Sequence, residues 1–331
     1  MKKLLALVLA LTMLVALPLL ASCNQPTAPD AAPEIRVWTL NGTTGFGMAQ
    51  LIDADKKGTA ALDYTFTVET AATNVRDALI NGSADIGAVP TNMASALYNA
   101  TNGEVLLLAL NTRGVLYLVA NTGNVTAPAS LADLAGKTVY VPAQNPTFIT
   151  KALLDKAAVA NVTLDSTTYA EPAALQTALS SGLVDYAVLP EPMVTIAKTK
   201  AAQSSVTLSE TPLNLTAEWD KYFTEGSLVQ GCVVVRKAFA EAHPAEVAKF
   251  LEEYEASINY VTENPESAAQ MIADAGIFAQ APVAKKAIPK CNLCFVAGAD
   301  MKAAMSTFLA AMPASSIGGK VPDDGFYYVA K

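Results

Sequence analysis

The chain has 331 residues, of which 52% are hydrophobic and 16% are charged. This composition excludes a disordered protein, because it supplies enough apolar surface for the cores of about two domains of roughly 150 residues each. The formal charge of −8, from 22 Lys and Arg against 30 Asp and Glu, argues against a nucleic-acid-binding protein. Because the chain has a single histidine and four cysteines, we do not expect a His-based metal site, a Ser-His-Asp triad or a disulfide scaffold. We expect no cofactor.

The first 23 residues have the pattern of an export signal. Two lysines precede an apolar run over residues 4–20, and the sequence LASC then ends at Cys23. The run is shorter than the roughly 20 residues that a membrane-spanning helix needs. The LASC ending resembles a bacterial lipobox, which implies removal of residues 1–22 and attachment of acyl chains such as palmitate to Cys23. An uncleaved anchoring helix is the alternative, and it leaves the following domain on the same side of the membrane.

Residues 23–34 are the acylated cysteine and a predicted flexible tether. The stretch NQPTAPDAAPE is polar, rich in Pro and Ala, and without hydrophobic periodicity. Eleven residues span at most about 36 Å. We therefore expect an exported protein held by its lipid anchor at the outer face of the cell membrane.

Strand and helix patterns alternate from residue 35 onwards. Helical patterns begin near residues 48, 73 and 146, and a longer amphipathic stripe follows His243-Pro244. Beyond it we expect three more helical segments, opened by Pro265, Pro282 and Ala299, and no further strand. Apolar or alternating runs predict strands at 35–40, 64–69, 85–89, 105–110, 115–120, 138–141 and 228–236.

One unit of the chain recurs at an offset of 100 residues. Six of the sixteen positions in residues 78–93 are identical to those in 178–193, namely the Ala-Leu pair, Gly, Asp, Pro and Met. In both copies a helix ends at Gly, and an apolar strand runs from Asp to Pro. Two similarly built halves with alternating strands and helices predict α/β lobes with largely parallel sheets.

Two strand regions are interpreted as chain crossings between the lobes. The first lies around residues 111–114 and the second in the strand at 228–236. On this basis, residues 35–112 and 234–331 are expected to form lobe 1, and residues 113–233 to form lobe 2.

The sequence resembles the nitrate/sulfonate/taurine-type substrate-binding proteins of ABC importers. The resemblance is carried by IRVWTLNGTTGFGMAQLID, by the pair GSADIGAVPTN and GLVDYAVLPEP, and by the tail GGKVPDDGFYY. It implies a two-lobed type II periplasmic-binding-protein fold with the ligand cleft between the lobes. It also implies a monomeric, non-enzymatic binding protein that delivers its solute to a permease and its ATPase.

The resemblance leaves several alternatives open. Sulfonates, nitrate-like anions and thiamine-precursor pyrimidines are all solutes of such proteins. A receptor that presents its ligand to a membrane sensor is an alternative function. An enzyme of pyrimidine or menaquinone precursor synthesis on the same fold is a less favoured one, because the sole histidine, His243, opens a helix far from every expected cleft loop.

Four loops are the candidate ligand-binding segments, two in each lobe. Ligands of α/β sheets sit beyond the carboxyl ends of strands, where helix N-termini present free N–H groups that suit anions. The alternatives are ordinary turns and helix caps, and Glu191 could either accept from a ligand N–H or favour its helix N-terminus. The candidate residues in these loops are Asn41, Thr43, Thr44, Gly45, Phe46, Thr91, Asn92, Gln144, Asn145, Thr147 and Glu191.

Outside these loops, Arg113 and Trp219 are also candidates for ligand contact. Arg113 could pair with an anionic group, and its alternative is a solvent-facing arginine at the crossing. Trp219 could stack on an aromatic ligand, and packing of a surface segment is its alternative. Phe46 is equally suited to line the pocket or to fill the core.

The spacing Cys291-x-x-Cys294 is typical of a redox or zinc half-site. Zinc needs four ligands, and only Cys232 and His243 remain in the folded part, neither at suitable spacing. We therefore expect small buried side chains at these positions, with a local disulfide as the alternative, and a core position for Cys232.

Overall fold

The computed structural model describes residues 33–329 of the protein. The predicted signal at 1–22, the lipidation site Cys23 and all of the tether except its last two residues lie outside this range. None of the helices between residues 33 and 329 has the length and apolar character needed to cross a membrane. Within the same residues, no three His, Cys, Asp or Glu side chains gather into a potential metal site.

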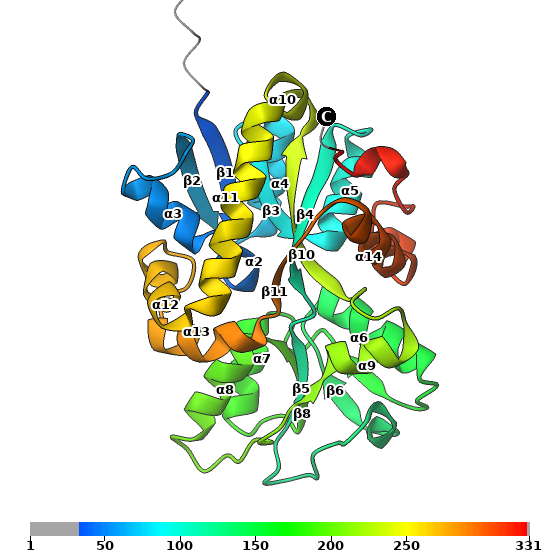
Figure 1. Ribbon diagram of the computed structural model, residues 1–331. Helices are drawn as coiled ribbons and strands as arrows, with labels where there is room; N and C mark the ends of the chain where they lie inside the picture. Colours follow the sequence, from blue (N-terminus) through cyan, green and yellow to red (C-terminus); the bar gives the residue numbers. More distant parts are fainter. Residues whose placement is uncertain (1–32, 330–331) are drawn as a thin grey trace, which may run out of the picture. The chain divides into compact units, whose positions relative to one another are not determined.

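Two sheets organise the described chain (Figure 1), which confirms the predicted two-lobed α/β fold. We call the six-stranded sheet with its helices lobe 1, and the five-stranded sheet with its helices lobe 2. Lobe 1 has the strand order β11-β4-β10-β3-β1-β2 and lobe 2 the order β7-β6-β8-β5-β9. The strands are β1 (Ile35–Leu40), β2 (Tyr64–Glu69), β3 (Ile86–Pro90), β4 (Val105–Arg113), β5 (Leu116–Ala120), β6 (Thr138–Tyr140), β7 (Thr163–Asp165), β8 (Tyr186–Pro190), β9 (Leu213–Asn214), β10 (Val229–Arg236) and β11 (Leu293–Val296).

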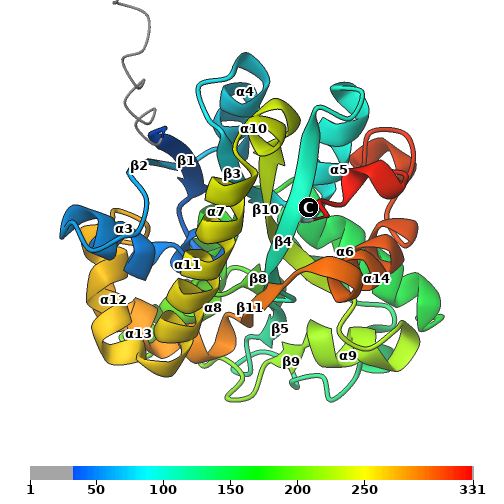
Figure 2. The same cartoon turned by 45° about the horizontal axis from the view of Figure 1, so that its top comes forward.

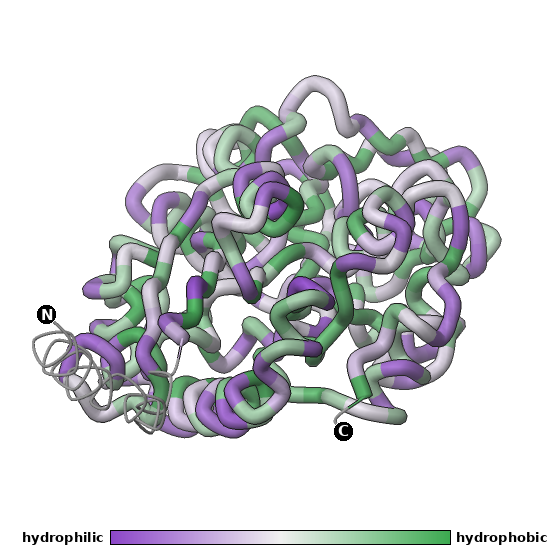
Figure 3. Tube along the Cα trace, turned by 90° about the horizontal axis from the view of Figure 1, so that it is seen from above, coloured by the Kyte–Doolittle hydropathy of each residue, from purple (hydrophilic) through white to green (hydrophobic). Residues whose placement is uncertain are grey.

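The helices cover the sheets with their apolar faces, and hydrophobic and hydrophilic residues accordingly alternate along them (Figure 3). Lobe 1 has α2 (Thr43–Phe46), α3 (Ala49–Lys56), α4 (Ala72–Asn81), α5 (Thr91–Ala100), α10 (Lys237–Ala242), α11 (Pro244–Glu263), α12 (Pro265–Asp274), α13 (Ala281–Ala287) and α14 (Gly298–Ala310). Lobe 2 has α6 (Asn145–Lys156), α7 (Pro172–Ser180), α8 (Met193–Ala201) and α9 (Leu215–Tyr222). Short 3-10 turns are η1 (Leu131–Leu134), η2 (Ile288–Lys290), η3 (Ala314–Ser316) and η4 (Asp324–Phe326).

Both faces of the six-stranded sheet are buried, as the apolar run in β10 requires. Val233 and Val235 pack with α3, α11, α12 and α13, whereas Cys232 and Val234 pack with α4, α5 and α14. Figures 1 and 2 both show α11 lying over the first of these faces. Cys232 is fully buried, which confirms its expected core position.

The repeat predicted at an offset of 100 residues is present in the fold. In each copy a helix is followed by a glycine in the left-handed region, Gly82 with φ 81° and Gly182 with φ 75°, where other residues are strained. The strands β3 and β8 then begin and end at equivalent positions. The carbonyl of Asp85 accepts from Arg236 N at 2.9 Å, and that of Asp185 accepts from Asn121 N at 2.8 Å, so each strand is joined to an antiparallel neighbour in the same way.

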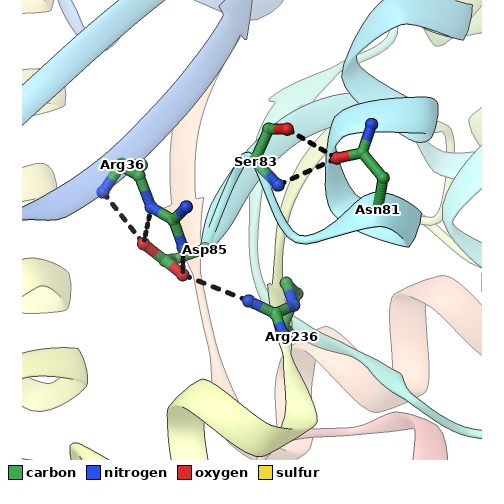
Figure 4. A network of polar contacts seen from close by, with 5 residues as sticks. All are labelled: Arg36, Asn81, Ser83, Asp85 and Arg236. Atoms are coloured by element: carbon green, nitrogen blue, oxygen red, sulfur yellow. Dashed lines mark hydrogen bonds and ion pairs between the residues drawn. The ribbon is translucent and has the colours of Figure 1, made fainter.

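The side chains of the two equivalent aspartates have different partners. The Asp85 carboxylate, 4% exposed, accepts from Arg36 Nε at 2.8 Å and Arg36 Nη2 at 2.6 Å, and Arg236 Nη1 lies 3.4 Å away (Figure 4). It therefore joins the beginnings of β1 and β3 to the end of β10. This edge of the sheet lies opposite the carboxyl ends of β1 and β3. Among residues 33–329, the side chain that donates to the Asp185 carboxylate is the neutral amide of Asn124, at 2.9 Å.

Several features differ from the expected elements or refine them. The sheets are mixed and not largely parallel, since β5 and β10 pair antiparallel with both of their neighbours, and the short strands β7 and β9 of lobe 2 were not expected. The segment after residue 236 was expected to contain helices only, but β11 pairs antiparallel with β4 across a bulge. Its four residues are too few for a recognisable alternation. The strand expected at 105–110 continues to Arg113 as β4. All of β10 from Val229 pairs within lobe 1, so the expected lobe boundary at 233/234 falls inside this strand.

We predict that Asp85→Asn lowers the free energy of unfolding by about 2 kcal/mol. The substitution leaves two arginines without their buried carboxylate, and the partial exposure of Arg36 limits the loss. Asp185→Asn is the matched control, and it should cost less than about 1 kcal/mol because its partner is neutral. Urea denaturation of both variants measures the difference, and equal losses would contradict the assigned role of Asp85.

Candidate functional site

The candidate site lies where loops at the strand ends of the two lobes meet. In lobe 1, β1 leads into α2 and β3 into α5, and in lobe 2, β6 leads towards α6 and β8 into α8. The Thr43 hydroxyl at the start of α2 donates to the backbone carbonyl of Glu191, which follows β8, at 2.7 Å. This hydrogen bond joins residues 148 positions apart in the sequence and brings the first and fourth predicted loops into contact.

The Glu191 carboxyl group is buried at this contact. The residue is 2% exposed, and Glu191 Oε2 accepts from the backbone N–H of Thr195 at 3.1 Å. Burial raises the pKa of the Glu191 carboxyl above its ordinary value. The Thr195 N–H, the nearby Thr195 hydroxyl and the ammonium groups of Lys290 and Lys198 offset part of that rise in pKa.

Residues of η2 and the segment after it complete the contact between the lobes. The Tyr117 hydroxyl, on β5, donates to the carbonyl of Lys290 at 3.0 Å, and Asn292 Nδ2 donates to the carbonyl of Gly114. Burial, with the Glu191 charge as a smaller cause, raises the pKa of Tyr117 to about 12. Cys291 Sγ lies 3.9 Å from Thr43 Oγ1.

The cysteines of the described residues are all free thiols. Cys291 is fully buried and Cys294 is half-buried. Burial raises the pKa of the Cys291 thiol, which disfavours the reactive thiolate. The Cys-x-x-Cys spacing therefore marks packing at the crossing between the lobes, as expected, and not a disulfide.

Asn111 is a site residue that the sequence analysis did not single out. It is 1% exposed near the end of β4, and its Nδ2 donates to the carbonyl of Thr44 at 3.2 Å and to the Tyr254 hydroxyl at 2.9 Å. This side chain therefore holds the first predicted loop, residues 41–46, through the carbonyl of Thr44. The available signal was an asparagine directly after the apolar run 105–110, in the segment 111–114 that the sequence analysis interprets as a chain crossing.

The start of α6 in lobe 2 contains a buried polar group without a partner among the described residues. Asn145 is 8% exposed, and its Oδ1 makes no hydrogen bond to any described residue. Gln144, just before it, is exposed and has φ 69°, a conformation that non-glycine residues rarely adopt. Thr147 is half-buried and donates to the carbonyl of Pro142 at 2.7 Å. Asn145 Oδ1 is thus a buried acceptor without a hydrogen-bond donor among the described residues.

Several other predicted residues use their polar groups within the protein. Thr91 is fully buried and donates to the carbonyl of Val229 at 2.8 Å, and Asn92 donates to that of Ser316 at 3.3 Å. Asn41 is exposed, and Thr44 is half-buried with its carbonyl held by Asn111. The role of these residues in ligand contact stays a prediction.

The two aromatic candidates, Phe46 and Trp219, are buried by packing. The glycine candidate, Gly45, occupies a position that has no room for a side chain. Phe46 is fully buried in the lobe 1 core beside Phe278. Trp219 is also fully buried, stacked on Phe223, with its N–H donating to Ser227 Oγ at 2.9 Å. Gly45 admits no side chain, because a Cβ would lie 1.9 Å from the Leu40 carbonyl oxygen.

Arg113 lies apart from the Thr43–Glu191 contact, at a separate cavity of about 580 Å³. Its Nη1 donates to the carbonyl of Gly226 at 3.3 Å, and Glu225, Glu255 and Asp300 also line the cavity. None of the other predicted site residues lines it.

Comparison with known proteins identifies the family. The model of the family described as NMT1/THI5 like matches residues 60–268, which is more than half of the chain. The chain belongs to the NMT1/THI5-like family. No curated protein sequence gives a significant match.

Solved structures similar to this NMT1/THI5-like protein share its fold. An ABC transporter protein of Parabacteroides distasonis is 24% identical, with a TM-score of 0.75 over 90% of this chain and 99% of that one. The periplasmic aliphatic sulphonate binding protein SsuA of Escherichia coli is 16% identical, with a TM-score of 0.65 over 84% and 86% of the chains. A Candida albicans protein described as having the generic periplasmic binding protein fold is 13% identical, with a TM-score of 0.53 over 89% and 93%. The chain therefore has the periplasmic-binding-protein fold.

We predict that Thr43→Val destabilises the protein by about 1–2 kcal/mol, because the Glu191 carbonyl loses its buried donor from the other lobe. Thr43→Ser keeps the hydroxyl and should cost less. Urea denaturation of both variants provides the comparison. Equal stability of Thr43→Val and the unaltered protein would rule out this bond as a contact between the lobes.

We also predict a pH-dependent effect of Glu191→Gln. Because burial raises the pKa of Glu191 in the folded state, its contribution to stability is full below the unfolded pKa and is lost as pH rises through the folded pKa. The Gln variant stays neutral, so its stability relative to the unaltered protein should increase as the pH rises above about 4, the ordinary pKa of a Glu side chain. Glu210→Gln, at an exposed position, is the control. A stability difference that does not vary with pH would contradict the prediction.

Proposed function

We propose that this protein captures a small polar solute between its two lobes outside the cytoplasm and delivers it to an ABC importer. The observation that carries the proposal is the meeting of strand-end loops from both sheets at Thr43 and Glu191, in a chain with the periplasmic-binding-protein fold. Strand ends of this kind are where α/β folds bind ligands. The relatives in solved structures include a sulphonate-binding protein, which supports a solute of similar size.

The charge of the loops limits the charge that a bound solute can carry. The four segments 41–46, 90–92, 143–148 and 190–192 contain no lysine or arginine and a single carboxyl group, that of Glu191. A multiply charged anion would meet no opposing charge from these segments. A singly charged sulfonate or nitrate-like anion could be held by the N–H groups at the start of α5, α6 and α8, and a polar pyrimidine could donate to Glu191 or Asn145.

Binding shifts the protein towards the conformation in which the lobes are close. A solute that contacts both lobes binds this conformation more tightly and so increases its population. The hydrogen bond from Thr43 to Glu191 already stabilises close lobes, and a solute held by Asn145 would add to it. The permease binds the conformation with close lobes, and it thereby distinguishes loaded protein, in which this conformation is more populated, from empty protein.

The location follows from the N-terminal sequence. The LASC sequence ending at Cys23 supports a lipid anchor, with residues 24–34 as the tether and the folded part acting as a monomer beside its permease. Residues 35–112 and 234–331 would form one lobe and 113–233 the other, except that residues 229–233 pair with the sheet of the first lobe as part of β10.

A role in binding is favoured over catalysis by the residues at the site. The sole histidine, His243, precedes α11 and packs against Phe239 in lobe 1. Glu191 is the one titratable side chain in the four loops, and its buried carboxylate accepts from the Thr195 N–H, which suits recognition better than acid–base chemistry.

Calorimetry with a solute panel tests the proposed function. We expect one of ethanesulfonate, nitrate or an aminopyrimidine to bind with one site per chain. If the aminopyrimidine is that solute, Asn145→Ala should lower its affinity about tenfold, which is about 1.4 kcal/mol, because its amino group can donate to the buried acceptor Oδ1 of Asn145.

Asn124→Ala is the matched control, since Asn124 contacts Asp185 at the opposite end of β8 and should leave the affinity unchanged. An aminopyrimidine that binds Asn145→Ala and the unaltered protein equally would place its site elsewhere.

A further inference from the structure

A second cavity lies between the lobes, next to the candidate site, and is lined by lysines. Its volume is about 610 Å³, and Thr195, Lys198, Lys286 and Lys290 contribute to its wall. Lys198 belongs to α8 of lobe 2, whereas Lys286 lies in α13 and Lys290 ends η2 of lobe 1. The hydrogen bond from Tyr117 to the Lys290 carbonyl, 3.0 Å long, holds η2 against lobe 2 beside this cavity.

The positive charges at this cavity are not neutralised by its own wall. No Asp or Glu lines it, and none of the three lysines forms an ion pair with a residue in 33–329. Lys198 Nζ donates to the backbone carbonyl of Glu210 at 2.6 Å. Such a cluster is unexpected in a chain whose formal charge is −8.

The lysines of the two lobes are close enough to affect each other. Burial lowers the pKa of Lys198, and the charge of Lys290 lowers it further. The carboxylates of Glu210 and Glu191 act in the opposite direction. These two carboxylates lie outside the cavity wall, and with three lysines present the surroundings retain an excess of positive charge.

We propose that this cavity binds a tetrahedral dianion such as sulfate or phosphate, which links α8 of lobe 2 to α13 and η2 of lobe 1. The ammonium groups supply the opposite charge and the hydrogen-bond donors that oxyanions require. Thr195, which is buried beside Glu191, is a further polar residue in the wall.

The position of the site gives the anion an effect on lobe closure. Bringing the lobes together places Lys198 and Lys290 near each other, and their repulsion opposes closure. A dianion between them replaces this repulsion by attraction. It therefore favours close lobes, and it should increase the affinity for a solute that also favours them.

The test measures sulfate binding to the full-length chain by calorimetry and thermal unfolding, at constant ionic strength set with sodium chloride. We expect one sulfate per chain and an affinity at least tenfold lower in the double variant Lys198→Gln and Lys290→Gln. Sulfate also stabilises proteins non-specifically. The relevant result is therefore the difference in sulfate response between variants.

The matched control is the double variant Lys56→Gln and Lys320→Gln, which changes the net charge equally. Lys56 Nζ, like that of Lys198, donates to a backbone carbonyl, that of Asp274, at 3.1 Å. We expect this variant to bind sulfate as the unaltered protein does. Equal sulfate responses in both double variants, or no saturable binding to the unaltered protein, would overturn the proposal.

The Asn145→Ala variant separates this site from the proposed solute site. It should retain sulfate binding even if it loses solute binding, whereas the Lys198 and Lys290 variant should lose sulfate binding. Sulfate binding that disappears in Asn145→Ala but persists in the lysine variant would place the anion in the solute site and overturn this proposal.

Discussion

The hydrogen bond from the Thr43 hydroxyl to the Glu191 carbonyl is the contact on which the site depends. It connects the start of α2 in one lobe to the residue after β8 in the other, at 2.7 Å. Because this contact uses a carbonyl and not the carboxylate, the Glu191 side chain remains buried with the Thr195 N–H as its hydrogen-bond donor. Burying this carboxyl group costs free energy when the lobes are close together. A solute that donates a hydrogen bond to the carboxyl group would reduce that cost.

The framework behind this contact is a repeated unit of helix, glycine, strand and proline. The two copies end their strands at Pro90 and Pro190, so that the loops following them have equivalent places in the two lobes. Their remote ends are held differently, by an arginine-bound carboxylate at Asp85 and by a neutral amide contact at Asp185. The repeat thus fixes the backbone geometry, while the side chains around it have diverged.

Much of the fold could be predicted because local patterns determined it. Strands 35–40 and 64–69 have the predicted ends, and the repeat located two further strands and their helices. β11 could not be predicted, since a four-residue strand next to a bulge depends on the edge of β4 that receives it. Among the predicted site residues, the sequence placed Thr43 and Glu191 in loops that the structure brings together, and their contact with a ligand, like that of Asn145, stays a prediction. It could not separate ligand contact from packing for Phe46 and Trp219, whose burial depends on distant segments, and it missed Asn111.

Charge is distributed unevenly around the contact between the lobes. The four loops carry one carboxyl group and no cation, and three lysines line a neighbouring cavity. This distribution favours a neutral or singly charged solute at the loops and a more highly charged anion at the lysines. Both ligands would act on the same equilibrium between separated and close lobes.

Small-angle X-ray scattering on residues 33–331 measures whether solute binding brings the lobes together. A solute identified by calorimetry should reduce the radius of gyration of the unaltered protein. Without solute, Thr43→Val should have a larger radius of gyration than the unaltered protein. A radius of gyration that stays the same when the solute saturates its site would contradict closure of the lobes by solute.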